Sequence, residues 1–265
     1  MGLADKLSKI KSLILGRKTP SLVFPPEIPP QDVDLITRLL APESPKDRLT
    51  LLSLERLCAT SISIDYIVCN NIPGDVVECG VWRGGTSILM AAKLANTKSS
   101  KTVFLFDTFE GMTKPTWHDV HSTTGVNALS TFNQLQTVSH NEWCFASFDD
   151  VQSNIKNFGL SQFTRLVKGP VEETLLTESN LPSLISLLRL DTDWYESTKL
   201  ELDVLYERVA PGGVILIDDY GHWDGARRAV DEFIAALPFG QKPLMWITDR
   251  SGRGFIKPLS VSPSI

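Results

Sequence analysis

The amino-acid sequence predicts an α/β fold, with a seven-stranded sheet of five parallel strands plus a C-terminal antiparallel hairpin, and with helices on both faces. Three observations support this prediction. From residue 73 onward, short runs rich in valine, isoleucine and leucine alternate with stretches of helical periodicity, which is typical of βαβ units. These runs are apolar almost throughout, as expected for strands buried on both faces. The last two runs are joined only by residues 249–253, which are too few for a crossover helix.

The individual elements follow in a regular order along the chain. Two helices are expected before the first strand, at 32–40 and 47–70. The five parallel strands are expected at 75–81, 102–107, 164–168, 186–191 and 213–218. Further helices are expected at 86–95, 151–158, 196–209 and 226–237, and the hairpin strands at 244–248 and 254–257. Residues 108–148 show no clear period, and we expect a lid or an inserted helical piece there.

The same patterns divide the chain into three regions. Residues 1–30 combine a short amphipathic pattern with a proline-rich stretch that cannot be helical, and they are expected to form an N-terminal arm. Such an arm is either a solvated tail or a segment that packs on a neighbouring subunit. Residues 31–72 are expected to form a helical N-terminal extension, and residues 73–265 the domain that contains the sheet.

Composition and charge exclude several classes of protein. The 265 residues carry a formal net charge of −5, and 42% of them are hydrophobic, so we expect a globular protein that binds no nucleic acid. No stretch approaches the roughly 20 apolar residues of a membrane span, so we expect no membrane partner. The first residues lack a secretory pattern and the four cysteines form no CxxC pair, which favours reduced thiols and a cytoplasmic location.

A glycine-rich turn follows the first predicted strand. Gly80, Gly84 and Gly85 form a G-x-x-x-G-G pattern between this strand and a helix. Glycines let a ligand approach the backbone, and the start of a helix offers free N–H groups. A dinucleotide-binding turn would read G-x-G-x-x-G instead. Glu78 precedes the turn and suits an ammonium group, which favours the methionine part of S-adenosylmethionine (AdoMet). The alternative is a tight turn that binds no ligand.

Acidic residues end three of the predicted strands. Asp107 ends the second strand, where a carboxylate can accept both ribose hydroxyls of a nucleoside, although it could equally cap a turn. Asp191 ends the fourth strand, and Asp218 and Asp219 end the fifth. Because neighbouring parallel strands end at one edge, these carboxylates should lie close together and repel one another. A divalent cation such as Mg²⁺, Mn²⁺ or Ca²⁺ would relieve this repulsion. The alternative is that the acids cap helices, as Asp193 could.

Four segments between about residues 73 and 235 resemble one enzyme family. These segments read GVWRGG, FDTFEG, LRLDTDWYEST and APGGVILIDDYG. They look like the macrocin O-methyltransferase family (TylF/MycF-like), whose members are AdoMet- and Mg²⁺-dependent sugar O-methyltransferases of antibiotic biosynthesis. The sequence is more distantly similar to the catechol and caffeoyl-CoA O-methyltransferases. The resemblance implies a class I methyltransferase (Rossmann-like) fold, which matches the predicted order of strands, and makes residues 73–265 the AdoMet-binding domain.

The resemblance also implies roles for particular residues. The metal, Mg²⁺ or Mn²⁺, would be held by Asp191, Asp218 and Asp219. The residues expected to bind AdoMet are Glu78, Gly80, Val81, Trp82, Arg83, Gly84, Ser87, Asp107, Gly169, Pro170, Val171 and Asp191. Members of the family are typically oligomeric, so a homo-oligomer, either dimer or tetramer, is expected.

The expected reaction is in-line transfer of the sulfonium methyl group to a hydroxyl group. The acceptor is expected to be a sugar on a natural product or glycan, and the alternative is a catechol-like aromatic. Two residues are candidates for the base that accepts the hydroxyl proton: Asp191, beside the metal, and His140, from the 108–148 segment. Two other functions remain open at this point, namely an NAD(P)-linked oxidoreductase and a non-catalytic AdoMet sensor.

Overall fold

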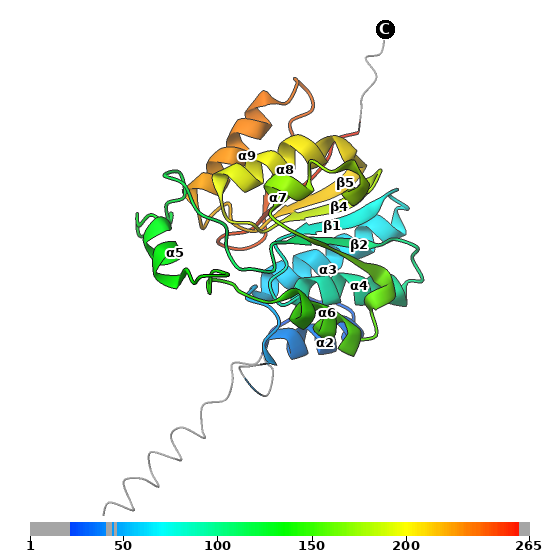
Figure 1. Cartoon of the computed structure of the whole chain (residues 1–265). Coiled ribbons are helices and arrows are strands. Elements are labelled where there is room, and N and C mark those ends of the chain that lie inside the picture. Colours follow the sequence, from blue (N-terminus) through cyan, green and yellow to red (C-terminus); the bar gives the residue numbers. More distant parts are fainter. Residues whose placement is uncertain (1–21, 41–43, 45–46, 260–265) are drawn as a thin grey trace, which may run out of the picture.

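The computed structural model describes residues 22–40, 44 and 47–259, and its core is one seven-stranded sheet in the order β3-β2-β1-β4-β5-β7-β6 (Figure 1). Strands β1 to β5 are parallel, and β7 pairs antiparallel with both β5 and β6. The strands are Asp75–Cys79 (β1), Val103–Asp107 (β2), Thr164–Lys168 (β3), Ile185–Leu190 (β4), Val209–Ile217 (β5), Trp246–Ile247 (β6) and Arg253–Ile256 (β7). The predicted fold class is confirmed, including the C-terminal hairpin.

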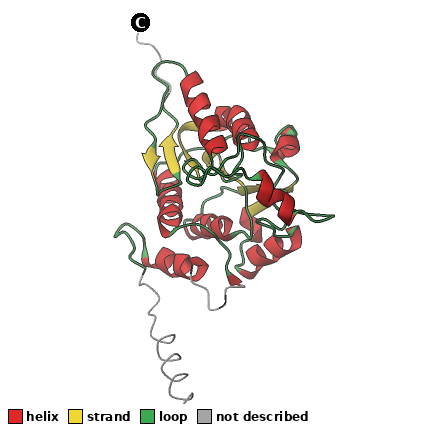
Figure 2. Ribbon diagram, turned by 90° about the vertical axis from the view of Figure 1, so that its left-hand side faces the viewer, coloured by secondary structure: helices red, strands yellow, loops and turns green. Residues whose placement is uncertain are grey.

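Helices cover both faces of the sheet (Figures 1 and 2). The α-helices are Pro30–Leu40 (α2), Leu54–Cys69 (α3), Gly85–Asn96 (α4), Leu129–Leu135 (α5), Phe148–Asn157 (α6), Val171–Thr174 (α7), Tyr195–Leu205 (α8) and Asp224–Ala236 (α9). Short 3₁₀ turns lie at Ser161–Phe163 (η2), Glu178–Asn180 (η3) and Tyr206–Arg208 (η4). Successive strand side chains point to opposite faces, so Val76 packs with α3 and α4, whereas Val77 packs with α8.

The helical extension is attached to the sheet domain by an apolar cluster and a buried ion pair. Ile28 and Ile36 pack with Leu89 of α4, so the end of the predicted arm belongs to this extension. Residues 1–21 of that arm lie outside the described residues. Lys93 of α4 is buried, and its ammonium group pairs with Asp32 of α2. A buried lysine must be paired to keep its charge, so this contact fixes α2 on α4.

The 108–148 segment forms an insertion that stands at one side of the sheet and contains the short helix α5 (Figure 1). Asp119 within it is fully buried, and its carboxylate accepts hydrogen bonds from the backbone N–H of Thr116 (2.6 Å) and of Tyr195 (2.8 Å). The second bond attaches the insertion to the first residue of α8. The insertion is thereby held against the edge at which the parallel strands end.

Some element ends differ from the prediction. Strand β5 begins at Val209 rather than at residue 213, and the strand pairing with β4 shifts register near this point. Gly212 takes a φ of +82°, a backbone conformation that permits such an irregularity without strain. The helix predicted for 196–209 ends earlier, at Leu205, and continues as the turn η4. Within the described residues, no helix is long and apolar enough to cross a bilayer.

Candidate active site

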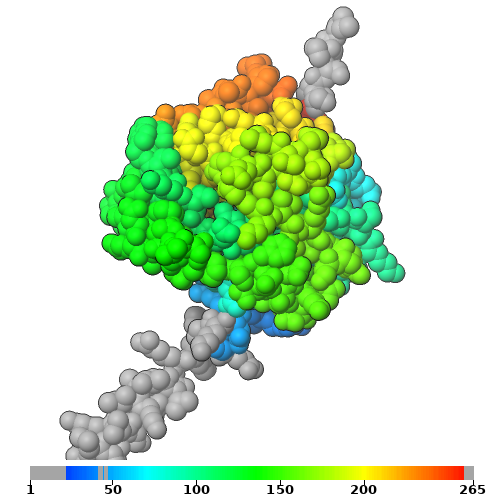
Figure 3. All heavy atoms as spheres, viewed as in Figure 1, coloured from blue at the N-terminus to red at the C-terminus, as the bar shows by residue number. Residues whose placement is uncertain are grey.

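A cavity of about 330 Å³ lies at the carboxyl ends of the parallel strands. Its wall consists of residues that follow β1 to β5, together with residues 49–52 and Arg56 from the helical extension. In the space-filling view the surface is hollowed beside the 108–148 segment (Figure 3). Open α/β sheets bind their ligands at this edge, so the cavity is the candidate active site.

The glycine-rich turn after β1 forms one wall of the cavity. Gly80 has a φ of +83°, and a Cβ atom placed on it would lie 2.0 Å from the carbonyl oxygen of Asp191. Only glycine therefore fits where the β1 and β4 loops touch. Gly84 also takes a left-handed conformation and precedes the first residue of α4. Gly80, Val81 and Trp82 of this turn line the cavity, and donor binding by the turn stays a prediction.

Asp107 joins this turn to the end of β2. Its Oδ2 accepts hydrogen bonds from the backbone N–H groups of Val81 (2.7 Å) and Trp82 (3.1 Å), and its Oδ1 accepts one from Phe109 (2.7 Å). Burial raises the pKa of this carboxyl, and the three N–H donors oppose that rise. Thr108 Oγ1 also lies 3.5 Å from Oδ1, but its hydroxyl donates a shorter bond of 2.7 Å to the carbonyl oxygen of Gly111. A carboxylate offers about four acceptor positions, so a ligand hydroxyl can take the fourth. Asp107 therefore holds the glycine-rich turn in place. It also lines the cavity, where its fourth acceptor position could bind a ribose hydroxyl.

Glu78 lies behind the cavity rather than in its wall. Its side chain is buried, and it accepts hydrogen bonds from Ser87 Oγ and from Nη1 of Arg189 (2.8 Å). Burial raises the pKa of Glu78 to about 7, while the Arg189 guanidinium opposes this shift. Both carboxylate oxygens thus have partners inside the protein. Glu78 therefore lies outside the cavity lining, and its role beside the ammonium group of a donor stays a prediction.

Three carboxylates meet in the cavity where β4 and β5 end. Each of Asp191, Asp218 and Asp219 offers one oxygen, and these oxygens lie within 4.8 Å of one another. Asp219 is buried, and its Oδ2 has no hydrogen-bond partner among the described residues. Burial, followed by the charges of Asp193 and Asp218, raises the pKa of Asp219 well above its ordinary value. A buried acceptor left unsatisfied, in an all-oxygen donor set of like charges, fits a hard cation such as Mg²⁺ or Mn²⁺.

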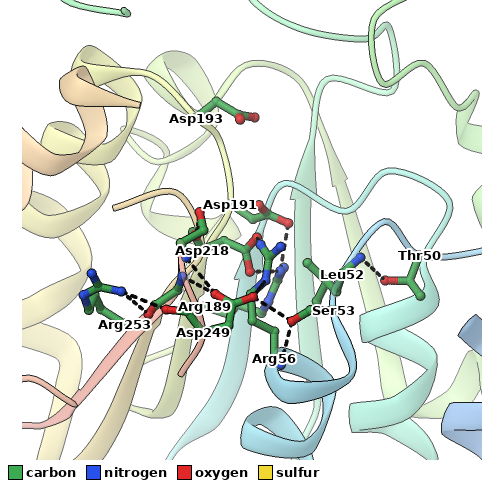
Figure 4. Close-up of polar contacts among 12 residues, drawn as sticks. Thr50, Leu52, Ser53, Arg56, Arg189, Asp191, Asp193, Asp218, Asp249 and Arg253 are labelled. Carbon is green, nitrogen blue, oxygen red and sulfur yellow. Dashed lines mark hydrogen bonds and ion pairs between the residues drawn. The ribbon is translucent and has the colours of Figure 1, made fainter. Parts of the chain in front are cut away.

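Two arginines approach the same carboxylates, and the sequence analysis predicted neither (Figure 4). Arg189 Nη2 lies 2.8 Å from Asp191 and 2.6 Å from Asp218, and Arg56 of α3 pairs with Asp218 and Asp249. A signal for Arg189 existed, because a charged residue inside a buried strand requires acidic partners. No signal existed for Arg56, which lies 162 residues before Asp218.

An aromatic corner borders the cavity near Asp193. Trp223 Nε1 donates a 2.7 Å hydrogen bond to Asp193 Oδ1. The rings of Trp143, Trp194 and Trp223 meet edge to face, with centroids 5.0–5.9 Å apart. Trp143, Trp223 and Asp193 line the cavity. The corner thus offers an apolar surface beside a carboxylate, an arrangement that suits a ligand with both apolar and hydroxyl groups.

The structure places the predicted site residues in two groups. Those that line the cavity are Gly80, Val81, Trp82, Asp107, Gly169, Val171, Asp191, Asp218 and Asp219. Those outside its lining are Glu78, Arg83, Gly84, Ser87, Pro170 and His140. His140 Nε2 lies 2.8 Å from Glu142, and its Nδ1 faces Ser139 and Thr137, all within its own loop. The structure therefore does not bring His140 to the carboxylates, whereas His222, after β5, lines the cavity.

Comparison with known proteins decides the family. The family described as Macrocin-O-methyltransferase (TylF) matches residues 24–252, which include both the helical extension and the cavity. The chain belongs to the TylF family. The predicted resemblance is confirmed, and the chain is an O-methyltransferase rather than an oxidoreductase.

Relatives of the TylF enzyme are named as O-methyltransferases, and one of these names contains a rhamnosyl group. The chain is 31% identical over 232 residues to 8-demethyl-8-(2,3-dimethoxy-alpha-L-rhamnosyl)-tetracenomycin-C 4'-O-methyltransferase of Streptomyces olivaceus, covering 86% of this chain and 83% of that protein. It is 34% identical over 210 residues to demethyldecarbamoylnovobiocin O-methyltransferase of Streptomyces niveus, covering 78% and 75%. The solved structure of the O-methyltransferase NovP superposes with a TM-score of 0.70 at 28% identity, covering 85% of this chain and 88% of that one.

Proposed function

We propose that this TylF-family enzyme transfers the methyl group of AdoMet to a hydroxyl group of a sugar attached to a natural product, with the help of Mg²⁺ or Mn²⁺. The observation that carries the proposal is the unpartnered Oδ2 of buried Asp219, in a group of carboxylates at the ends of β4 and β5, beside the Gly80 turn. The name of the relative that methylates a rhamnosyl group supports the sugar acceptor.

The donor is expected to lie along the wall formed by the β1, β2 and β3 loops. The backbone at Gly80 leaves space for the methionine part, and Asp107 has an acceptor position for a ribose hydroxyl. Gly169 and Val171 line the end of the wall, where the adenine would lie. Glu172 also lines it, and its Oε2 has no hydrogen-bond partner among the described residues. This oxygen would accept a hydrogen bond from the adenine amino group.

Asp191, Asp218 and Asp219 would hold the divalent cation. When bound to the acceptor hydroxyl, such a cation lowers the pKa of that hydroxyl and fixes its direction. Asp191 is partly exposed at the cavity surface, whereas Asp218 and Asp219 are buried beneath it. The carboxylates would therefore bind the cation from the protein side, and the acceptor would bind it from the cavity side.

Asp193 is our candidate for the group that accepts the proton. The ion pairs of Arg56 and Arg189 go to other carboxylates, whereas Asp193 accepts a hydrogen bond from Trp223 and lies beside Asp219. Burial, followed by the charge of Asp191, raises the pKa of Asp193 to about 8, which suits a group that takes up a proton. Asp191, the base expected from the sequence, is already engaged by Arg189 and would be a metal ligand. The aromatic corner next to Asp193 would support the apolar face of a sugar ring and exclude water.

The experiment that tests this function measures S-adenosylhomocysteine release by the purified chain over a panel of rhamnosylated natural products, free sugars and catechols. Release that requires a glycoside and is abolished by EDTA and restored by Mg²⁺ is the expected result. Release with catechols alone would favour the aromatic acceptor, and full activity in EDTA would contradict the metal. AdoMet binding with no turnover over the whole panel would support a sensor. The homo-oligomeric state and the cytoplasmic location stay predictions, and light scattering measures the first.

A further inference from the structure

Both carboxylate oxygens of Asp218 already accept hydrogen bonds from arginine side chains. Oδ1 accepts from Arg189 Nη2 at 2.6 Å, and Oδ2 accepts from Arg56 Nη1 (Figure 4). Whichever oxygen a cation takes, it meets a guanidinium group there. A cation and a guanidinium group compete for the same negative charge, so binding of one weakens binding of the other.

The two arginines differ in how firmly they are held. Arg189 has 3% of its side chain exposed and contacts three carboxylates, those of Glu78, Asp191 and Asp218. Moving it would leave several buried charges unpaired, which is costly. Arg56 has 20% of its side chain exposed and contacts two carboxylates, and it lines the cavity. Arg56 is therefore the arginine that can leave Asp218.

Asp249 provides an anchor that would keep Arg56 near the site after such a move. Arg56 Nε lies 2.9 Å from Asp249 Oδ2, so the two side chains form an ion pair, although Nε has no aligned hydrogen-bond partner among the described residues. Asp249 is itself fixed, because it accepts hydrogen bonds from the backbone of Ser251 (2.9 Å) and Gly252 (2.7 Å) and from Ser53 Oγ (2.7 Å). Arg56 can thus release Asp218 while its guanidinium group remains ion-paired with Asp249. Ser53 is also the N-cap residue of α3, the helix that carries Arg56, so the same side chain contacts Asp249 and the first turn of this helix.

We infer that Arg56 is an internal counter-ion of the metal centre, which neutralises Asp218 when the cation is absent and competes with the cation for it. This inference rests on the proposed metal site. It makes Arg56 a positioning residue that sets how tightly the cation is held. The free energy of cation binding is then reduced by that of the Arg56–Asp218 ion pair, which must break first. Removing Arg56 therefore strengthens cation binding.

The test is a titration of the purified full-length chain with Mn²⁺ alone, in which electron paramagnetic resonance measures the concentration of the free ion. Arg56→Gln removes the charge, and we expect it to bind Mn²⁺ on the order of tenfold more tightly than the wild type, since hydrogen bonds between charged groups are of that strength. Arg56→Lys keeps the charge, but a single ammonium group cannot match the two-sided contact, so an intermediate affinity is expected. Without metal, Arg56→Gln should melt below the wild type, and Mn²⁺ should raise its melting temperature by more.

Arg253→Gln is the matched control. Arg253 lies near the same turn, but its guanidinium group donates to the backbone carbonyls of Asp249 and Gly252 rather than to Asp218 (Figure 4). Its removal changes the net charge equally and should leave Mn²⁺ affinity unchanged. If Arg56→Gln bound Mn²⁺ no more tightly than the wild type, the inference about Arg56 would be overturned but the metal site would stand. The same holds if Arg253→Gln tightened Mn²⁺ binding as much as Arg56→Gln does. No Mn²⁺ binding by any variant would overturn the proposed metal site as well.

Discussion

The indole nitrogen of Trp223 lies 2.7 Å from a carboxylate oxygen of Asp193, and this hydrogen bond joins the residue before α9 to the loop after β4. Asp193 takes a φ of +68°, which is unfavourable for a residue other than glycine. Trp223 is buried, so the hydrogen bond is shielded from water. The contact therefore holds the carboxylate in one orientation, at the cavity wall, against a local preference of the backbone for another conformation.

Replacing Trp223 by phenylalanine tests whether this orientation matters for catalysis. Trp223→Phe keeps an aromatic ring but removes the N–H donor. If Asp193 accepts the proton, a loosely held carboxylate should lower kcat by roughly tenfold or more, because misplacement of a reacting group by about 1 Å has a large effect. The free energy of unfolding should fall by about 1–3 kcal/mol, the cost of an unsatisfied buried group. Initial-rate kinetics and urea unfolding measure the two effects.

Trp194→Phe is the control for this experiment. Trp194 is also buried, and its Nε1 donates a 2.9 Å hydrogen bond to the carbonyl oxygen of Thr113 rather than to an acid. It should lose similar stability but retain most of the kcat of the wild type. Equal kcat values for Trp223→Phe and the wild type would remove the support for Asp193 as the base.

Asp219 should show a conflict between stability and function. Its carboxylate is buried among like charges, with Oδ2 unpartnered in the described structure. Asp219→Asn removes one of these charges, so without metal the variant should be as stable as the wild type or more so. It should also lose a metal ligand, and we expect at least a hundredfold weaker Mn²⁺ binding, with AdoMet affinity little changed. Thermal melting in EDTA and calorimetric titrations with Mn²⁺ and AdoMet measure these properties.

Asp224→Asn provides the same change of charge on an exposed residue of α9. This variant should match the wild type in both Mn²⁺ and AdoMet binding. If Asp219→Asn were strongly destabilised in EDTA, the conclusion that its charge is unfavourable without a cation would be wrong.

Asp107 should affect donor binding through the shape of the glycine-rich turn. Asp107→Asn replaces one acceptor oxygen by an amide, so the N–H groups of Val81 and Trp82 and the ribose hydroxyl would compete for fewer acceptor positions. We expect AdoMet to bind roughly tenfold or more weakly, as measured by calorimetric titration. Asp75→Asn is the control, since Asp75 Oδ1 accepts from the backbone N–H of Thr102 (2.9 Å) at the other end of the same strands. Weaker AdoMet binding by both variants would point to a general loss of stability.

The sequence predicts the sheet and the carboxylate group for the same reason. Each parallel strand is an apolar run, and its end is marked by a change to glycine or aspartate, so Asp191, Asp218 and Asp219 could be placed on neighbouring strand ends. The oxygens of these three residues do lie close together. Short helices such as α5 and α7 could not be predicted, because four to seven residues give too few turns for a period to appear.

The sequence did not predict which side chains the charged site residues contact in the folded protein. The position of Glu78 before Gly80 predicts a role toward the donor, but no pattern predicts its contact with the buried Arg189 of the adjacent strand. Arg56 reaches Asp218 only because α3 packs beside the sheet, which is a tertiary contact without a local pattern. His140 depends on the path of an irregular loop, and hydrogen bonds within that loop turn it toward Glu142.

Glu78 also predicts how stability depends on pH. In the folded protein burial raises its pKa to about 7, whereas in the unfolded chain it should have the ordinary value of about 4.5. The folded state therefore binds the proton more tightly, and this contribution to stability is complete below pH 4.5 and is lost as the pH rises to 7. Glu78→Gln cannot titrate. Relative to this variant, the wild type should lose on the order of 3 kcal/mol of unfolding free energy between pH 4.5 and 7.

Urea unfolding in EDTA at half-unit steps from pH 4.5 to 8 measures this difference, because the other titrating groups are shared and cancel. Glu207→Gln is the control, since its exposed side chain stays in water in both states, and its pH profile should run parallel to that of the wild type. A constant difference between wild type and Glu78→Gln over this range would mean that Arg189 keeps Glu78 ionised throughout. The 2.8 Å contact with Arg189 would then affect the pKa of Glu78 more than burial does, and it would keep this acid charged.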